Sequence, residues 1–283
     1  MTDKAAERAL SLLGQAFGER GVEFFAPLSF SETLPLFQVR SQSRLPQETR
    51  SVIFCLLPYY IGPYPQRNLS RYAIVDDYHQ VGRTLLEEVC ALLARDFPQE
   101  AFAPFLDSSP FDEVRCAAQA GLGLRGENGM VINPVYGSYT FIGEIATTLT
   151  LPSAGRPMEH CPNCGLCKRA CPSGALNDQG FQLDRCRSHI TQKKGALTPQ
   201  EAQEIRLGGF VWGCDVCNDV CPYNRNPKCT PIRPFYLDPE PVLTAEKLPQ
   251  LLHRKAFAWR GKGVLLRNLE LIQPQVPKKE ETP

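Results

Sequence analysis

The chain has 283 residues, 43% of them hydrophobic and 22% charged, so it holds enough apolar material for one or two compact domains. Its 31 basic and 30 acidic residues give a formal net charge of +1, which excludes a polyelectrolyte whose partner could be inferred from charge alone. No apolar stretch approaches the roughly 20 residues of a membrane-spanning helix. Residues Met1 to Phe17 have the pattern of an amphipathic helix without the features of a signal peptide, so we expect a cytoplasmic location.

The N-terminal half of the chain combines helical and strand patterns. Apolar residues recur at helical spacing over Glu7 to Phe17 and over Tyr78 to Leu93. Val52 to Leu57 and Tyr139 to Leu149 are instead typical of buried strands. Together these patterns predict an α/β or α+β domain over residues 1–155.

A further helix is predicted over Phe111 to Ala120. Ser109 is its expected N-cap, with Pro110 at the first helical position. Gly121 is expected to be the left-handed residue just after the helix. Gly121 to Gly126 also satisfies G-x-G-x-x-G, but that motif binds dinucleotides only between a strand and a helix. Here a helix precedes it and an extended segment follows, so we reject the dinucleotide interpretation.

Twelve cysteines in a chain without a signal peptide should stay reduced, and their close spacing indicates metal or redox chemistry. One group forms the C-x2-C-x2-C-x3-C-P run of bacterial ferredoxins, and a second repeats its C-x2-C-x3-C-P half. The first group is Cys161, Cys164, Cys167 and Cys171, and the second is Cys214, Cys217 and Cys221, with Cys186 as the nearby candidate for the missing ligand.

In two-cluster ferredoxins the fourth cysteine of such a run binds the other cluster. We therefore expect two [4Fe-4S] clusters, one held by Cys161, Cys164, Cys167 and Cys221, the other by Cys171, Cys186, Cys214 and Cys217. Paired structural zinc sites are the alternative, but they would leave the additional in-line cysteine and the Cys-Pro ends unexplained. Cys55, Cys90 and Cys116 are expected to be small buried hydrophobes, and Cys229 has no assigned role.

The cysteine-rich pattern divides the rest of the chain. Residues 156–228 are predicted to form a ferredoxin-like domain. Residues 229–272 are predicted to form a Pro-rich linker followed by a helical segment over Ala245 to Trp259. Residues 273–283, with three prolines and a run of charges, are expected to be disordered.

Asp107 lies just before the helix predicted from Phe111. An aspartate is common where a chain turns into a helix, so the residues alone favour a turn-forming role over that of a catalytic acid. Arg71 and Tyr72 precede Asp77-Tyr78-His79, and they fit either a turn facing a cofactor or an ordinary helix N-terminus. None of the four histidines has the spacing of a metal site with another, so structural or solvated roles are expected for them.

Several strings, in one order over about residues 50–226, together resemble the epoxyqueuosine reductase family, the cobalamin-dependent iron-sulfur enzymes of queuosine tRNA modification. They are Arg71-Tyr72-Ala73, Asp77-Tyr78-His79, Asp107-Ser108-Ser109-Pro110, Ala120-Gly121-Leu122-Gly123, Gly143-Glu144-Ile145, the ferredoxin run, Arg185-Cys186, and Gly213-Cys214-Asp215 through Asn224. A weaker similarity continues over Gly263 to Leu269. Ferredoxin runs are widespread, but their combination with the Asp-Ser-Ser-Pro and Gly-Leu-Gly strings is specific.

The resemblance implies an α/β domain that binds cobalamin, a ferredoxin-like domain that passes electrons from two [4Fe-4S] clusters to the cobalt, and a short helical C-terminal segment. It implies that Asp107 lies in the cobalamin pocket and donates a proton to the substrate oxygen during epoxide removal. Arg71 and Ser188 match positions of the cobalamin pocket, and Lys193 matches a position near the substrate. The implied partners are tRNA or a queuosine-type nucleoside and an external low-potential electron donor. We expect a monomer without membrane contact.

Two departures from the family leave the substrate open. After Cys186 the family typically has Ser-Tyr-Leu-Thr and an acid, whereas this chain has Ser188-His189-Ile190-Thr191-Gln192. Glu127 stands where a lysine is usual. Longer members also continue past the position of Leu269 into a helical-repeat region that helps to hold tRNA, so we expect a reduced tRNA-binding surface.

Two other functions are compatible with the sequence. One is a related corrinoid reductase that acts on a smaller substrate or a free nucleoside. The other is a ferredoxin-type electron-transfer protein without cobalamin, which would leave about 150 N-terminal residues without a role.

Overall fold

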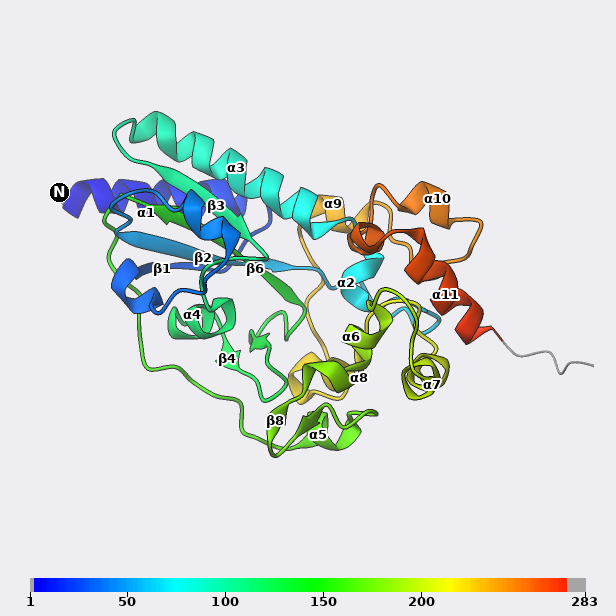
Figure 1. Ribbon diagram of the computed structural model, residues 1–283. Coiled ribbons are helices and arrows are strands. Elements are labelled where there is room, and N and C mark those ends of the chain that lie inside the picture. The colour runs from blue at the N-terminus through cyan, green and yellow to red at the C-terminus, as the bar shows by residue number, and fades with distance from the viewer. Residues whose placement is uncertain (1–2, 274–283) are drawn as a thin grey trace, which may run out of the picture.

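A four-stranded antiparallel sheet lies at the centre of the computed structural model, which describes residues 3–273 (Figure 1). The strand order is β1-β2-β6-β3, with β1 at Phe25–Ser29, β2 at Ser51–Pro58, β3 at Phe102–Leu106 and β6 at Thr140–Thr147. Every residue of β2 is buried, which explains why its apolar run does not alternate. Both buried strands expected from the sequence are confirmed.

Helices cover both faces of the sheet (Figure 1). Successive side chains of β2 point to opposite faces, so this strand packs against helices on both sides. The long helices α1 (Asp3–Gly18) and α3 (Tyr78–Asp96) pack on the face that carries Ile53 and Leu57. Phe54 points to the other face, where α4 (Glu113–Gln119) packs. The predicted mixed α/β fold and its two long helices are confirmed.

The start of α4 differs from the sequence prediction, which placed Ser109 at the N-cap and Pro110 in the first turn. The N-cap is Asp112, whose carboxylate accepts a hydrogen bond from the backbone N–H of Arg115 at 3.1 Å. The Ser109 hydroxyl instead accepts from the backbone N–H of Phe111 at 3.2 Å, in a separate turn. Ser109 and Asp112 are both of a type that caps helices, and Asp112 is the one that does so. The turn at Ser109 precedes the helix and places Phe111 in the core.

The end of α4 agrees with the prediction. Gly121 adopts a left-handed conformation with φ of +78°, and its N–H donates to the carbonyl of Ala118. The short strands β4 (Leu124–Arg125) and β5 (Val131–Ile132) follow. The glycine motif therefore joins a helix to a strand, the reverse of a dinucleotide-binding turn.

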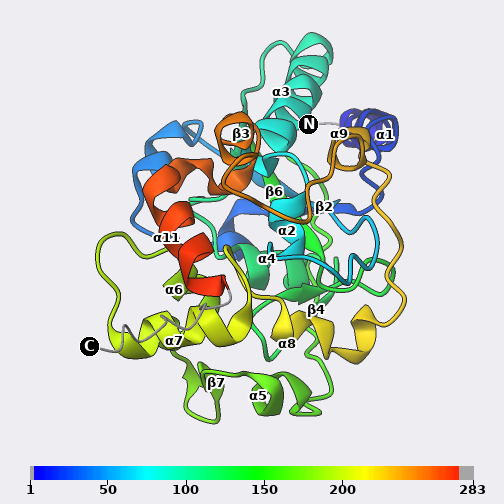
Figure 2. The same ribbon diagram turned by 90° about the vertical axis from the view of Figure 1, so that its right-hand side faces the viewer.

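The cysteine-bearing region packs below the sheet and consists of short elements (Figure 2). They are α5 (Leu166–Ala170), β7 (Leu176–Asn177), β8 (Gly180–Phe181), η3 (Leu183–Arg185), α6 (Arg187–Thr191), α7 (Pro199–Gly208), α8 (Val216–Asp219) and η4 (Pro222–Asn224). Helices α5 and α8, which carry the two cysteine motifs, contact each other. The sequence repeat thus becomes a pair of adjacent helical turns.

The continuous helix expected over Ala245 to Trp259 is wrong. The chain forms α10 (Leu248–Leu251), then the 3-10 turn η5 (Ala256–Arg260), and then α11 (Lys262–Ile272). The break falls at Lys255, which is fully buried and donates from Nζ to the carbonyls of Ile74 and Asp238 and to Asp76. A buried ammonium must find acceptors, and helix geometry cannot supply them here.

The Pro-rich stretch before α10 contains one short helix, α9 (Arg233–Tyr236), and it buries Ile232 and Phe235 in the core beside the sheet. Apart from Gln273, the tail expected to be disordered lies outside the described residues. The domain boundaries themselves stay a prediction. Across residues 3–273, no helix combines the length and apolarity that crossing a bilayer requires.

Candidate active site

Asp107 occupies a strained turn at the end of the edge strand β3. Both Asp107 and Ser108 have positive φ, at 53° and 45°, a conformation that residues other than glycine adopt at an energetic penalty. Such strain persists where the surrounding structure enforces it, and it clusters at functional sites. The turn presents the Asp107 carboxylate to a cavity, with about half of the side chain exposed.

His79, in the first turn of α3, bridges Asp107 to a second carboxylate. Its Nε2 lies 3.0 Å from Oδ2 of Asp107, and its Nδ1 lies 2.7 Å from Oδ1 of Asp77. Burial alone would lower the pKa of His79, but the hydrogen bonds to Asp107 and Asp77 outweigh it and raise the pKa to about 9. The hydrogen bond from His79 in turn lowers the pKa of Asp107. At neutral pH the proton of this pair therefore resides on His79.

The cavity in front of Asp107 has a volume of about 610 Å³, within the range of cofactor and ligand pockets. Its lining residues come from α2 (Arg71–Ile74), α3, the Asp107 turn, the end of α6, the Trp212 loop and η5. They are Tyr72, Asp77, Tyr78, His79, Arg83, Asp107, Ser108, Gln192, Trp212, Ala256 and Trp259. Aromatic walls with a few charged groups on one side suit a large, flat, partly polar ligand.

A pair of buried carboxyls, Glu113 of α4 and Glu144 of β6, lies behind the Asp107 turn. Burial raises the pKa of both, that of Glu113 to about 7, and the charge of Asp107 adds to each shift. Among the described residues, neither carboxylate oxygen of Glu144 has a hydrogen-bond partner. Ionising both carboxyls would bury two negative charges that repel each other, so burial and repulsion both favour a protonated form. We conclude that the pair retains a proton around neutral pH.

The first set of expected cluster ligands surrounds one hollow. Cys161, Cys164, Cys167 and Cys221 all line a cavity of about 270 Å³ between α5 and η4. Each iron corner of a cubane cluster takes one thiolate, so four sulfurs around a hollow of this size fit a [4Fe-4S] group. Cys221 comes from the second motif, as the crossed assignment requires.

The second set of expected ligands is Cys171, Cys186, Cys214 and Cys217. Burial raises the pKa of Cys217 to about 12, and the charges of Cys214, Cys186 and Cys171 add to this shift, which places their sulfurs nearby. Cys186 also raises the pKa of Cys214. Within residues 3–273, no three His, Cys, Asp or Glu side chains converge on a point suited to one metal ion. The division of the eight cysteines into two ligand sets therefore stays a prediction.

Arg71 and Ser188 do not line the Asp107 cavity. Arg71 Nε lies 3.1 Å from Oδ1 of Asp219, and its Nη1 donates to the carbonyls of Gly62 and Pro63. The Ser188 carbonyl accepts from the Thr191 hydroxyl within α6. The structure thus places Arg71 at the junction between the sheet and α8, and it places Ser188 two residues after Cys186.

Of the residues that depart from the family pattern, Glu127 and His189 lie away from the cavity. Glu127 lines the hollow of the first cysteine set, and its carboxylate pairs with Lys168 at 2.9 Å. His189 Nε2 lies 3.9 Å from Asp184 Oδ1. Lys193, expected near the substrate, pairs with Glu201 of α7. Gln192 is the residue of this segment that reaches the cavity.

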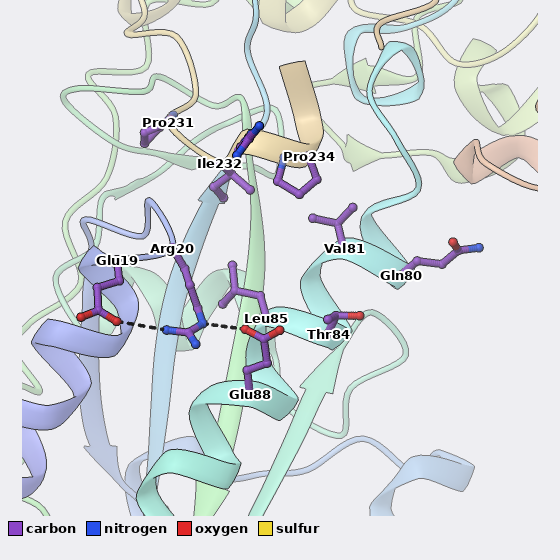
Figure 3. A pocket seen from close by; sticks show the side chains of 11 residues that line it. Glu19, Arg20, Gln80, Val81, Thr84, Leu85, Glu88, Pro231, Ile232 and Pro234 are labelled. Carbon is purple, nitrogen blue, oxygen red and sulfur yellow. Dashed lines mark hydrogen bonds and ion pairs between the residues drawn. The ribbon is translucent and has the colours of Figure 1, made fainter. Parts of the chain in front are cut away.

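A separate cavity of about 460 Å³ lies between the end of α1, α3 and the segment before α9 (Figure 3). Arg20 spans it and pairs with Glu88 at 2.9 Å and with Glu19 at 3.8 Å. Its α3 residues, such as Thr84 and Glu88, occupy the helix face opposite His79. None of the described residues lines both this cavity and the one at Asp107.

Comparisons with known proteins agree with this geometry. A family model described as epoxyqueuosine reductase QueG, DUF1730 matches residues 40–108, and a 4Fe-4S double cluster binding domain matches residues 160–224. An epoxyqueuosine reductase of Lactococcus garvieae is 34% identical over 222 residues, covering 73% of this chain and 61% of that protein. The chain belongs to the epoxyqueuosine reductase family.

The Escherichia coli member of the epoxyqueuosine reductase family is 33% identical over 193 residues, covering 68% of this chain and 48% of that protein. The chain thus spans less than two thirds of the length of these relatives. A solved epoxyqueuosine reductase bound to an epoxyqueuosine-modified tRNA stem loop has the same fold, with a TM-score of 0.78 at 23% identity over 94% of this chain and 80% of that one.

The family matches enclose the site. Arg71, His79 and Asp107 fall inside the epoxyqueuosine reductase match, and all eight expected cluster ligands fall inside the double-cluster match. Trp259 lies outside both, in a segment that sequence periodicity assigned to a helix. The Asp107 to His79 contact was missed because the residues lie 28 positions apart, although both belong to strings typical of the family.

Proposed function

We propose that this chain reduces epoxyqueuosine to queuosine in tRNA, in the cytoplasm, with electrons from an external low-potential donor. One observation carries the proposal. The Asp107 and His79 pair faces a cavity whose wall includes Trp212, two residues from Cys214. A candidate acid and a segment next to an expected cluster ligand therefore line the same cavity.

The reaction requires two electrons and two protons. Both carbon–oxygen bonds of the epoxide break, a carbon–carbon double bond forms, and the oxygen leaves as water. The two cysteine sets would hold [4Fe-4S] clusters that pass electrons singly. Cobalamin, when bound in the Asp107 cavity, would supply a metal centre that collects these electrons beside the substrate.

Asp107 hands one proton to the leaving oxygen. In the resting site this proton is on His79, whose Nε2 lies 3.0 Å from Asp107 Oδ2. Before the transfer Asp77 stabilises the positive charge of the imidazolium. Transfer along the hydrogen bond gives Asp107 the proton and leaves His79 neutral, with its Nδ1–H still directed at Asp77. Asp107 is thus the catalytic acid, His79 holds its proton, and solvent supplies the second proton.

We keep Asp107, Arg71 and Ser188 as proposed contacts of cobalamin. For Asp107 this agrees with its position at the cavity wall. For Arg71 it requires the pair with Asp219 to open or the cofactor to approach from the α8 side. Cys161, Cys164, Cys167 and Cys221 are the proposed ligands of one cluster, and Cys171, Cys186, Cys214 and Cys217 are those of the other.

The test is turnover of an RNA stem loop that carries epoxyqueuosine, using anaerobically reconstituted protein, cobalamin and a low-potential reductant. We expect the modified base to lose the mass of one oxygen. Asp107→Asn protein with the same iron and cobalt content serves as the matched control and should be nearly inactive. An unchanged stem loop after incubation with fully loaded wild-type protein would refute the proposal, and turnover of the free nucleoside alone would indicate a smaller substrate.

A further inference from the structure

Trp259 stands out among the residues that line the Asp107 cavity. It is 58% exposed, although it lies on the wall of a pocket, whereas Trp212, the other tryptophan of the chain, is 1% exposed. An indole left open at the mouth of a polar cavity has a large flat surface without a partner. Trp259 is therefore available for contact with something that enters or covers the cavity.

Arg260 adds a cation to this aromatic surface. Its guanidinium carbon lies 3.7 Å from the centre of the Trp259 ring, in stacking geometry. Its Nε atom is buried and has no hydrogen-bond partner among the described residues. The half-buried guanidinium thus places a positive charge beside an exposed ring, a combination that suits a nucleobase with its phosphate.

The turn that carries Trp259 is held rigidly. Lys255, just before η5, is anchored by three hydrogen bonds from its Nζ atom. Phe257 is fully buried, with its ring centre 6.2 Å from that of Trp212. A recognition surface that is already fixed loses little conformational entropy when a ligand binds.

We propose that Trp259 and Arg260 form a subsite that stacks a nucleobase next to the nucleoside held at Asp107. The inference rests on the proposed function, because it assigns the neighbouring base and its phosphate to a single-stranded RNA loop. The RNA backbone enters over η5, its base stacks on the exposed face of Trp259, and Arg260 contacts the phosphate. The subsite therefore selects RNA over a free nucleoside.

The experiment measures binding of a fluorescently labelled epoxyqueuosine stem loop by anisotropy, using the reconstituted holoenzyme. Base stacking of this kind predicts that Trp259→Ala weakens RNA binding about tenfold, while Trp259→Phe retains most of the affinity. Arg260→Gln should reduce the salt dependence of binding by about one phosphate contact. Binding of the free nucleoside, measured by competition, should fall much less than binding of the stem loop in Trp259→Ala protein. Tyr236→Ala is the matched control, because Tyr236 is 47% exposed and does not line the cavity.

Three results would overturn the inference. Unchanged RNA affinity in Trp259→Ala protein would remove the stacking role. Equal losses for the stem loop and the free nucleoside would place Trp259 on the reacting nucleoside or in the structure of the pocket. Loss of cobalamin with intact RNA binding would place it against the cofactor. A wild-type protein that binds the stem loop but never reduces it would contradict the proposed function and leave the stacking result to be judged by itself.

Discussion

The sheet region and the cysteine-bearing region differ in the burial of their thiols. Cys55 and Cys116 are completely buried on the two faces of the sheet, where desolvation raises the pKa of each thiol and makes it inert. The eight expected cluster ligands are all at least partly exposed, and four of them line one hollow. The first region is stabilised by apolar packing, and the second is built from short turns around sites for inorganic clusters. The cavity with Asp107 lies where the two regions meet.

The largest expected effect comes from replacing a cluster cysteine, with the replacement of a buried cysteine of the sheet region as the control. Cys221→Ser should remove one cluster, lowering iron by about half and abolishing turnover, because this residue is the crossed ligand from the second motif. Cys116→Ser, the matched control, should keep all its iron and lower the free energy of unfolding by about 1–3 kcal/mol through burial of a hydroxyl. Iron analysis and denaturant unfolding measure both. Full iron in Cys221→Ser protein would contradict the crossed assignment.

Replacing Asp107, which lies where the two regions meet, should have the next largest effect on turnover. Asp107→Asn should lower turnover by about 10²- to 10⁴-fold, the range for loss of a positioned general acid. The strained turn should persist, because asparagine tolerates left-handed backbone conformations. Single-turnover kinetics on protein with normal iron and cobalt content would measure the change. Wild-type rates would show that the proton reaches the oxygen from another group.

The buried carboxyl pair behind Asp107 should make the sheet region less stable at alkaline pH. Because the folded-state pKa values of Glu113 and Glu144 are raised above 4.5, stability falls as pH rises from about 4.5 towards those values, which for Glu113 is about 7, and the destabilising effect of Glu113 is nearly complete above it. Glu144→Gln should therefore raise the free energy of unfolding by about 2 kcal/mol at pH 8 and have little effect at pH 5. Denaturant titrations at the two pH values, with exposed Glu7→Gln as control, test this. A variant destabilised at both pH values would refute a shared proton.

Replacing His79 should give the smallest change in turnover. In the wild-type protein, His79 should set the alkaline limit of activity. Its raised pKa means that its interactions stabilise the fold fully below about pH 6.5, and that this stabilisation is lost as pH rises through about 9. Turnover should fall over the same upper range, because His79 then no longer holds the proton for Asp107. His79→Gln should lower turnover by roughly tenfold at pH 7 and abolish that alkaline decline. An alkaline decline that survives in the variant would assign it to another group.

Local patterns in the sequence predicted the parts of the molecule that depend on neighbours along the chain. The apolar run of β2 and the spacing of the cysteines are of this kind, and so is the left-handed Gly121. The contact of His79 with Asp107 depends on how α3 packs against β3, which periodicity does not encode. Lys255 breaks an expected helix because it finds acceptors on distant segments.

Resemblance to the family placed Asp107 in its role, whereas the residues alone favoured a turn. The turn is confirmed and is strained, and the carboxylate lines the cavity, so the position is compatible with a catalytic acid, whose role stays a prediction. Arg71 shows the opposite case. Its position in a family string suggested the cofactor pocket, but its guanidinium is engaged by Asp219 and backbone carbonyls. For Arg71, the family string alone did not show which groups its guanidinium contacts.

The most direct test of the account is the content of iron, sulfide and cobalt per chain, with the visible spectrum, after anaerobic purification and incubation with cobalamin. The account predicts about eight irons and one bound cobalamin, as two cubane clusters and a corrinoid require. Eight irons without cobalt would contradict the role of the Asp107 cavity and favour an electron carrier. Zinc in place of iron would contradict the assignment of both cysteine sets.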